Sequence, residues 1–552
     1  MTNPSGRGAD DPIEAAAPMR WNGWGDPEKA GDLPFAVRSL LPLLLGRIRR
    51  PRPALALTEV RLSGSAFTSA DAAVFAEVIG VDNVRTDAES RIRHAGGRST
   101  PDLLRRRDAD QAAPDAVLRP GGHDEVVACL QLAAERDIAV IPFGGGTSVV
   151  GALDPDRGAH RCVVSLDLGR VSGLLRYDAV SAEAVLAAGT TGPEAERLLA
   201  QHGMELGHYP QSFRYATIGG FAAARSSGQN SAGYGRFDTM VTGIRVATPT
   251  GDIALGRSPG SAAGPDLIRL FLGSEGIYGV ITEVTVRVHP VPAERVMESW
   301  AFPDFATGAA ALRIVAQHGG GPTVLRLSDE AETSVSLAQV GKIGKALAKG
   351  ASAVTVFEGD GVAERRARTA ALLRAAGGTS LGEGGSEDWL RTRFDGPYLR
   401  DALLDAGVFC ETLETATTWS RLAGLREAVT AALKRGFAEA DRKAFVMCHV
   451  SHIYPTGASL YFTVLAPLGT DALDAWDGVK RRAGDAIMAA GGTISHHHAV
   501  GRDHALWLGE EIGDTGIRIL AAVKRELDPR GIMNPGAVLG AATPIPARSA
   551  GA

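Results

Sequence analysis

Cysteine is scarce in this chain, with 4 residues among 552, and none of them lies in a CxxC pair. Cys129, Cys162, Cys410 and Cys448 each stand alone in an apolar stretch. Because paired spacing is missing, they indicate neither a zinc site nor a disulfide framework. We expect four reduced core residues of a cytosolic protein, and no bound metal.

Excess positive charge is missing as well. The formal net charge is −5, and no basic stripe with interleaved aromatic residues occurs. A protein that depends on phosphate contacts to nucleic acid needs such a stripe, so nucleic acid is excluded as the expected partner. The 45% of hydrophobic residues and 22% of charged residues instead indicate a globular protein of two or three domains.

Long apolar runs are missing too. The first residues are polar and acidic, which predicts no secretory leader, and the last four are Ser-Ala-Gly-Ala rather than a peroxisomal signal. The run VRSLLPLLLGRIRRPRP at residues 37–53 is too short to cross a bilayer. It suits an interfacial element or, equally, an ordinary helix end with a solvated basic turn. We expect a cytoplasmic protein that contacts a membrane surface at most peripherally.

Three consecutive histidines, His496, His497 and His498, stand in the segment GTISHHHAVG. Their imidazoles titrate close to physiological pH and can therefore give or take protons. A solvated loop or an adventitious metal patch is the alternative interpretation of such a run. The flanking apolar segments exclude an expression tag.

Three glycine-rich segments follow one another through the middle of the chain. They are PFGGGTS at residues 142–148, QSFRYATIGGFAAARSS at residues 211–227 and GSEGIYGVITEVTVRV at residues 273–288. Glycine allows unusual backbone dihedral angles and presents N–H groups to an anion without interference from a side chain. The first segment follows a short buried strand, IAVI, and suits a pyrophosphate. One such run is a weak signal, but three in this order are difficult to explain by turns.

These segments resemble the FAD-binding domain of the vanillyl-alcohol oxidase and p-cresol methylhydroxylase superfamily, over about residues 114–292. The chain lacks the GxGxxG of a nicotinamide site. Several relatives bond the flavin through a histidine of the glycine loop, where this chain has Thr147, so the resemblance implies non-covalent FAD. It implies as cofactor-binding residues Pro142, Phe143, Gly144, Gly145, Gly146, Thr147, Ser148, Gln211, Ser212, Tyr215, Ala216, Thr217, Gly219, Gly220, Ala224, Arg225, Ser226, Ser227, Glu275, Gly276, Gly279, Val280 and Ile281.

Within that superfamily, four further motifs resemble the alkyldihydroxyacetonephosphate synthase family. They are WNGWG at residues 21–25, YLRD at 398–401, SLYF at 459–462 and the histidine run. The resemblance covers about residues 21–535. Relatives that act on D-lactate or D-2-hydroxyglutarate carry GEHG or AEHG at the histidine site, and that glutamate is absent here.

The family exchanges the acyl chain of acyl-dihydroxyacetone phosphate for a long-chain fatty alcohol, without net electron transfer. The resemblance implies that Arg400 binds the substrate phosphate and that Arg326 is a second substrate-binding residue. It implies proton transfer by Tyr461 at the carbon beside the carbonyl. We expect histidine cations to lower the pKa of that phenol, and we rank His497 first because it stands at the glutamate position. Without the resemblance, Arg400 and Arg326 suit ion pairs and Tyr461 suits an ordinary strand aromatic.

The expected fold is α+β, with two main domains of the vanillyl-alcohol oxidase type. We expect an N-terminal helical extension at residues 1–113, an FAD-binding domain at 114–292 and a cap with an antiparallel sheet at 293–498. The segment 499–552 then returns to the FAD domain. A homodimer is left open. Two rival functions remain, which are an FAD-dependent 2-hydroxy-acid dehydrogenase or oxidase, and a catalytically idle flavin-binding relative.

Overall fold

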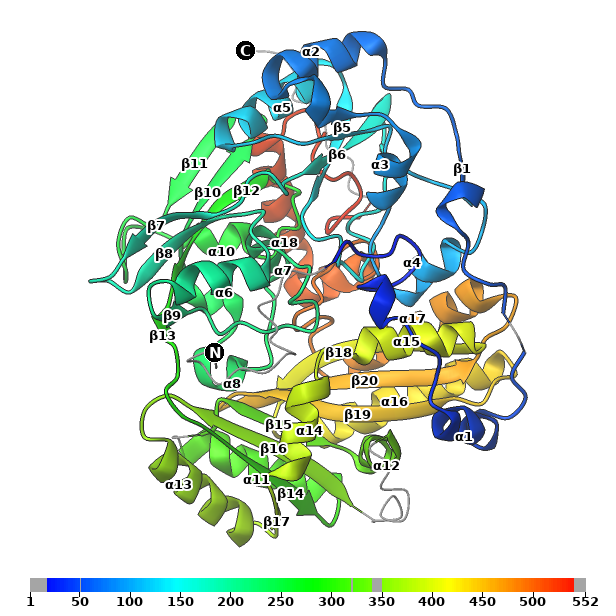
Figure 1. Cartoon of the computed structure of the whole chain (residues 1–552), viewed down its shortest axis with the longest axis vertical. Helices are drawn as coiled ribbons and strands as arrows, with labels where there is room; N and C mark the ends of the chain where they lie inside the picture. The colour runs from blue at the N-terminus through cyan, green and yellow to red at the C-terminus, as the bar shows by residue number, and fades with distance from the viewer. Residues whose placement is uncertain (1–16, 50, 319–320, 340–349, 541–552) are drawn as a thin grey trace, which may run out of the picture.

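The computed structural model describes residues 17–49, 51–318, 321–339 and 350–540. Two bodies stacked along the long axis make up the molecule (Figure 1). The upper body holds the glycine-rich segments and the lower one holds a large antiparallel sheet, which confirms the α+β two-domain fold. The C-terminal tetrapeptide lies outside the described residues.

The FAD-binding body is built on two sheets. The first has the order β2 (Val84–Arg85), β4 (Ala116–Leu118), β6 (Cys162–Asp167) and β5 (Ile138–Phe143). Strands β4, β6 and β5 are parallel, and β2 joins them antiparallel from the segment expected to be an N-terminal extension. The second has the order β11 (Gly251–Leu255), β10 (Val241–Thr248), β12 (Val280–Arg287), β8 (Glu183–Ala187) and β7 (Leu174–Asp178).

A crossover helix, α5 (His123–Glu135), joins β4 to β5. Its buried residues Val126, Cys129, Leu130 and Ala133 recur at helical spacing. They pack into one core with the buried strand Ile138–Phe143, whose almost continuous apolar sequence is typical of a strand covered on both faces. The glycine loop begins where this strand ends, at the carboxyl edge of the parallel sheet.

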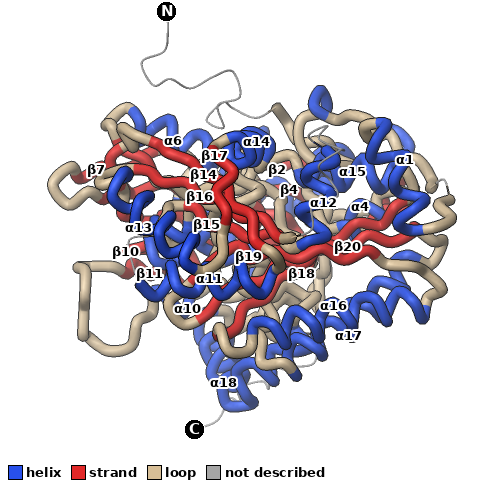
Figure 2. The backbone as a smooth tube through the Cα atoms, turned by 90° about the horizontal axis from the view of Figure 1, so that it is seen from below, coloured by secondary structure: helices blue, strands red, loops and turns tan. Residues whose placement is uncertain are grey.

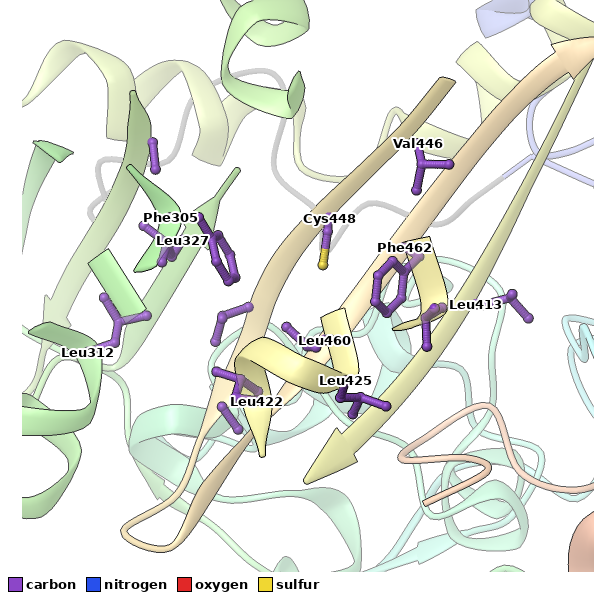
Figure 3. Close-up of a cluster of buried hydrophobic side chains, with 14 of the residues drawn as sticks. Phe305, Leu312, Leu327, Leu413, Leu422, Leu425, Val446, Cys448, Leu460 and Phe462 are labelled. Carbon is purple, nitrogen blue, oxygen red and sulfur yellow. The ribbon is translucent and has the colours of Figure 1, made fainter. Parts of the chain in front are cut away.

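The cap is a seven-stranded antiparallel sheet. Its order is β17 (Thr379–Gly382), β14 (Arg295–Phe302), β16 (Ala351–Glu358), β15 (Val324–Ser328), β19 (Phe445–Ile453), β20 (Gly457–Pro467) and β18 (Val408–Thr418). Helices α16 (Leu422–Glu439) and α17 (Ala472–Ala489) run along one face (Figure 2). Apolar side chains that alternate along β19 and β20 pack against them, including Cys448 and Phe462 (Figure 3). All four cysteines are buried and free, as expected.

Helix α1 (Phe35–Leu45) packs on the cap through Leu41 and Leu45. Before it, the WNGWG segment lies between the two bodies. The backbone N–H of Trp24 donates to Asp401 on α15 (Gly396–Asp405), and the Trp24 ring meets Tyr215 of the second glycine segment edge to face at 5.6 Å. Two motifs almost 400 residues apart are thus in direct contact.

The chain returns to the FAD body through α18 (Ala505–Leu527), which kinks at Gly513. Met533 forms a parallel bridge to Val140 of β5, and the Asn534 side chain donates to the carbonyl oxygens of Ala152 and Glu275. Because the last segment completes the sheet that carries the glycine loop, it stabilises the cofactor-binding body.

Candidate active site

The three histidines lie in a loop between α17 and α18, at the junction of the two bodies. We call residues 495–501 the histidine loop. A single carboxylate on β18, Glu414, fixes one end of this loop by accepting from the backbone N–H groups of His496, His497 and His498 at 2.8–3.0 Å. It also accepts from the Ser495 hydroxyl at 2.8 Å, and its side chain is fully buried.

A second carboxylate fixes the other end of the histidine loop. Glu275, in the third glycine segment, accepts from the backbone N–H groups of Val500 and Gly501 at 3.0 and 2.7 Å. Burial raises the pKa of Glu275 to about 7. One end of the loop is therefore held by the cap and the other by the FAD body.

Tyr461 lies beside this loop because of strand pairing. On β20 it is opposite Glu414 of β18 on one side and His449 of β19 on the other. Its ring stacks on His449 at 4.9 Å between centroids and meets His498 edge to face at 5.7 Å, with the His497 centroid at 6.1 Å. The structure thus brings together Tyr461 and the histidines that the sequence singles out.

The expectation of a lowered phenol pKa is wrong. Burial raises the pKa of Tyr461 to about 12, and the carboxylates Glu411 and Glu414 add to the effect. The same burial lowers the pKa of His498 to about 3 and holds that of His496 well below its ordinary value. Neutral imidazoles cannot supply the cationic field that would stabilise a phenolate.

The His497 ring lies closer to a carboxylate than the His496 ring does. His497 Nδ1 lies 3.4 Å from Glu414 Oε2, and His496 Nδ1 lies 4.0 Å from the same oxygen. The pKa of Glu414 is held well below its ordinary value, because hydrogen bonds and the attraction of His497 and the other two histidines outweigh the effect of burial.

Three residues of the site are absent from the sequence analysis. The His452 ring centroid lies 5.1 Å from that of His496, and the Tyr454 hydroxyl lies 2.6 Å from His496 Nε2. Glu414 is the third. The sequence does contain a signal for Glu414 and His452, because each stands in an apolar stretch that is typical of a buried strand. A glutamate or histidine that is buried must find a polar partner.

Arg326 lies in an ion pair. Its guanidinium contacts Glu332 and lies 3.0 Å from His449 Nδ1, and Glu332 is 3.0 Å from the same nitrogen. The pKa of Glu332 falls to about 2, because the attraction of His449 and Arg326 outweighs burial. The buried ion pair thus exists, and through His449 it lies directly behind the Tyr461 ring.

Arg400 is also paired. Its Nε and Nη2 atoms donate to Asp401 Oδ1 at 3.1 and 2.9 Å, and Nη1 donates to the carbonyl oxygen of Arg98. Arg98 and Arg106 are both buried nearby, and neither forms a carboxylate ion pair within the described residues. Burial, with the charge of Arg400, lowers the pKa of Arg106 to about 10. Asp102, Asp401 and Glu411 lie close enough to act on the three guanidinium groups, so the cluster contains charges of both signs.

The glycine segments meet one another at the carboxyl edge of β5. A Cβ atom on Gly145 would lie 1.9 Å from the Tyr215 carbonyl oxygen, and one on Gly276 would lie 2.7 Å from Pro142. A side chain at either position is excluded, because the first segment lies against the second at Gly145 and against the third at Pro142. Val280 and Ile281, further along the third segment, point into the cores.

The residues at this edge fit FAD. The backbone N–H groups from Gly145 to Ser148 find no acceptor among the described residues, and they follow the last residue of a parallel strand. Ser227 Oγ, in the second glycine segment, and His208 Nδ1, just before that segment, are buried without a hydrogen-bond partner among the described residues. A diphosphate offers the acceptors that such donors need. The side chains of Arg225 and Glu275 are committed elsewhere, to Asp238 and to the histidine loop.

Two family models match the chain, which are the FAD binding domain over residues 114–255 and the C-terminal domain of FAD linked oxidases over residues 291–538. Fold and site together define an FAD-dependent flavoprotein of the FAD-linked oxidase class. The alkyldihydroxyacetonephosphate synthase of Trypanosoma brucei brucei is 31% identical over 95% of this chain and 93% of its own length. The chain belongs to the alkyldihydroxyacetonephosphate synthase family.

Solved structures agree with this assignment. A structure of alkyldihydroxyacetonephosphate synthase has a TM-score of 0.80 and 28% identity, over 94% of this chain and 98% of the other. p-Cresol methylhydroxylase, at 16% identity and a TM-score of 0.66 over 85% of this chain and 96% of its own, shares the fold. The family inferred from the motifs is confirmed.

We expect the flavin to leave the protein on denaturation. Residues 142–155 contain neither histidine nor cysteine, and Thr147 occupies the loop. Acid precipitation, followed by absorbance of the supernatant and the pellet, measures the partition. Yellow colour that remains with the washed pellet would show a covalent bond to the protein.

Proposed function

We propose that this protein is an alkyldihydroxyacetonephosphate synthase, which exchanges the acyl chain of acyl-dihydroxyacetone phosphate for a long-chain fatty alcohol. The carbon–oxygen bond to the fatty acid breaks, the alcohol oxygen forms the new ether bond, and the alcohol proton is released. No electron is gained or lost overall. The observation that carries the proposal is the cluster of Tyr461, His497 and His498 at the junction of the FAD body and the cap.

The chain's own groups divide the proton work. His497, paired with Glu414, takes a proton from the carbon beside the substrate carbonyl. Tyr461 keeps its proton at neutral pH, since its pKa is raised to about 12. We therefore replace the role of base, expected from the sequence, by that of a hydrogen-bond donor to the carbonyl oxygen, where negative charge develops. Bound FAD supplies the electrophile for the exchange.

The phosphate is assigned to the arginine cluster. Arg98 and Arg106 are buried and Arg400 is largely buried beside them, and guanidinium groups offer planar sets of charged donors to phosphate oxygens. Arg400, on α15, also donates to Asp401, which accepts from the backbone N–H of Trp24 in the WNGWG segment. In this proposal the arginine cluster links the substrate phosphate to the contact between the FAD body and the cap.

Replacement of Arg400 by lysine is expected to weaken substrate binding by about 1.5–3 kcal/mol, the range for a hydrogen bond to a charged group. Lysine keeps the charge but loses the planar set of donors. Isothermal titration with acyl-dihydroxyacetone phosphate measures the dissociation constant, at equal FAD content. Arg391→Lys, on the exposed part of the cap, is the matched control. Unchanged affinity in the Arg400 variant would move the phosphate site elsewhere.

We further propose peripheral contact with a membrane surface through α1, which would bring long-chain substrates to a cytoplasmic enzyme. Phe35 and Leu43 are 84% and 75% exposed on this helix, and Arg47 and Arg49 follow it. Apolar side chains beside basic residues favour an anionic lipid surface. Within the described residues, no helix has the length and apolar character needed to cross a bilayer.

The decisive experiment is incubation of the purified protein with acyl-dihydroxyacetone phosphate and a labelled fatty alcohol in deuterated water. We expect a labelled ether product, deuterium at the carbon that carried the acyl group, and no accumulation of reduced flavin. Bleaching of the flavin by a 2-hydroxy acid under anaerobic conditions, without ether product, would replace the proposal by a dehydrogenase. Absence of both reactions would indicate a protein without this activity.

A further inference from the structure

Three imidazoles, two buried and one partly buried, surround one point beside Tyr461. The ring centroids of His452, His496 and His497 are 5.1, 5.7 and 5.2 Å apart, which is almost an equilateral triangle. One ring nitrogen from each can be chosen so that all three lie within 4.8 Å of one another. Nδ1 of His496 and Nδ1 of His497 are 3.0 Å apart. We call these residues the histidine triangle.

From this geometry we infer that the histidine triangle is a binding site for a divalent transition-metal ion of the zinc type, and that the ion inhibits the enzyme reversibly. Zinc binds imidazole nitrogens at about 2.0–2.1 Å in tetrahedral sites. Ligand nitrogens must then lie a little over 3 Å apart, so the rings need only a small movement toward the centre. Magnesium and calcium prefer oxygen ligands and are not expected to bind.

The surroundings of the triangle are those of a metal site. His452 Nε2 lies 2.9 Å from the Gly228 carbonyl oxygen, and His496 Nε2 lies 2.6 Å from the Tyr454 hydroxyl. Partners of this kind orient metal-binding imidazoles and fix their tautomers. The buried carboxylate of Glu414 also compensates part of the charge of a dication.

Binding needs no net loss of protons from the triangle. The facing Nδ1 atoms of His496 and His497 can share only one proton at their present distance. When the ion takes both lone pairs, that proton moves to the Nε2 atom of the same ring, and any hydrogen bond at a coordinating nitrogen is given up. His497 then has no free lone pair for the substrate proton. The inhibition, but not the binding, rests on the proposed function.

The test uses the FAD-loaded, full-length protein without a polyhistidine tag. After exposure to Zn²⁺ and gel filtration, elemental analysis is expected to find one zinc ion per chain in the wild type, whereas a parallel sample with Mg²⁺ retains none. His452→Gln and His496→Gln are each expected to bind zinc at least about 100-fold more weakly, more than the loss of an outer partner causes. His449→Gln, three residues before His452 on β19, should still retain one ion.

X-ray absorption at the zinc edge of the wild type gives a measurement that needs no variant, and we expect three imidazole ligands. The site would be overturned if the wild type retained no zinc, or if both triangle variants retained as much zinc as the wild type. An absorption spectrum without imidazole ligands would also overturn it. Zinc should also abolish alkyl transfer, and EDTA should restore it. If the protein forms no ether product at all, the proposed function fails while stoichiometry and absorption still report on the metal site.

Discussion

Tyr461→Phe is expected to lower the rate of alkyl transfer by about 10²- to 10³-fold, the usual loss when one donor to a developing oxyanion is removed. The phenol holds its proton at neutral pH, because its pKa is about 12, so the donor is present throughout the working range. Stacking on His449 does not need the hydroxyl, and the fold should persist. The measurement is ether formation at saturating substrate, with FAD content and thermal unfolding in parallel.

Tyr177→Phe is the control for this substitution. Tyr177 lies on β7 of the FAD body and contacts His202 rather than the histidine loop, so its replacement should leave the rate unchanged. Deuterium exchange at the substrate carbon separates the two proposed roles. His497→Ala should abolish exchange if it is the base, while Tyr461→Phe should only slow it. Normal exchange in the His497 variant would assign the base elsewhere, and a full rate in Tyr461→Phe would remove the tyrosine from the mechanism.

Glu414→Gln is expected to lower the free energy of unfolding by at least about 3 kcal/mol and to abolish activity. The carboxylate accepts from three backbone N–H groups and one hydroxyl, and hydrogen bonds to charged groups contribute about 1.5–3 kcal/mol each. An amide at this position keeps one oxygen but turns an NH₂ group toward donors. Denaturant unfolding measures the loss, and Glu427→Gln, exposed on α16 of the same cap, is the matched control.

The contribution of Glu414 to the free energy of unfolding also depends on pH, in a defined direction. The pKa of Glu414 is lower in the folded state than in the unfolded chain, so its stabilisation is complete above the unfolded value of about 4.3. It is lost as pH falls through the folded pKa. The difference between wild type and Glu414→Gln should therefore be largest near neutral pH and shrink in acid. A constant difference across this range, or one equal to that of Glu427→Gln, would contradict the assigned role.

The motifs identified in the sequence predict the fold well, because each is a local pattern with a local physical cause. The structure has a buried strand before the glycine loop and a strand at the end of the third glycine segment, as expected. Even so, the close contacts of Gly145 with Tyr215 and of Gly276 with Pro142 join different segments, which no single segment reveals. The two-body architecture and antiparallel cap follow the family resemblance.

The ion pairs and pKa values of the site could not be predicted from local motifs. Whether an arginine is free or paired can depend on a strand and a helix that meet only after folding, as Glu332 of α12 (Glu330–Gln339) meets Arg326 of β15. The pKa of Tyr461 depends on how deeply β20 is buried, and that depth is set by its neighbours in the sheet. Glu414 is one of two acidic residues in a strand of eleven, and only strand register places it opposite Tyr461.

Both carboxylates that hold the histidine loop accept from its peptide N–H groups, and Glu414 lies beside the His497 ring as well. The contacts to peptide N–H groups do not require particular side chains at residues 496–498. Mutation can exchange the triplet at residues 496–498 while the backbone stays in place, so a new set of reactive groups arrives already positioned against the flavin body. A scaffold that separates the placement of its reactive groups from their identity can change its chemistry in a few substitutions without first becoming unstable.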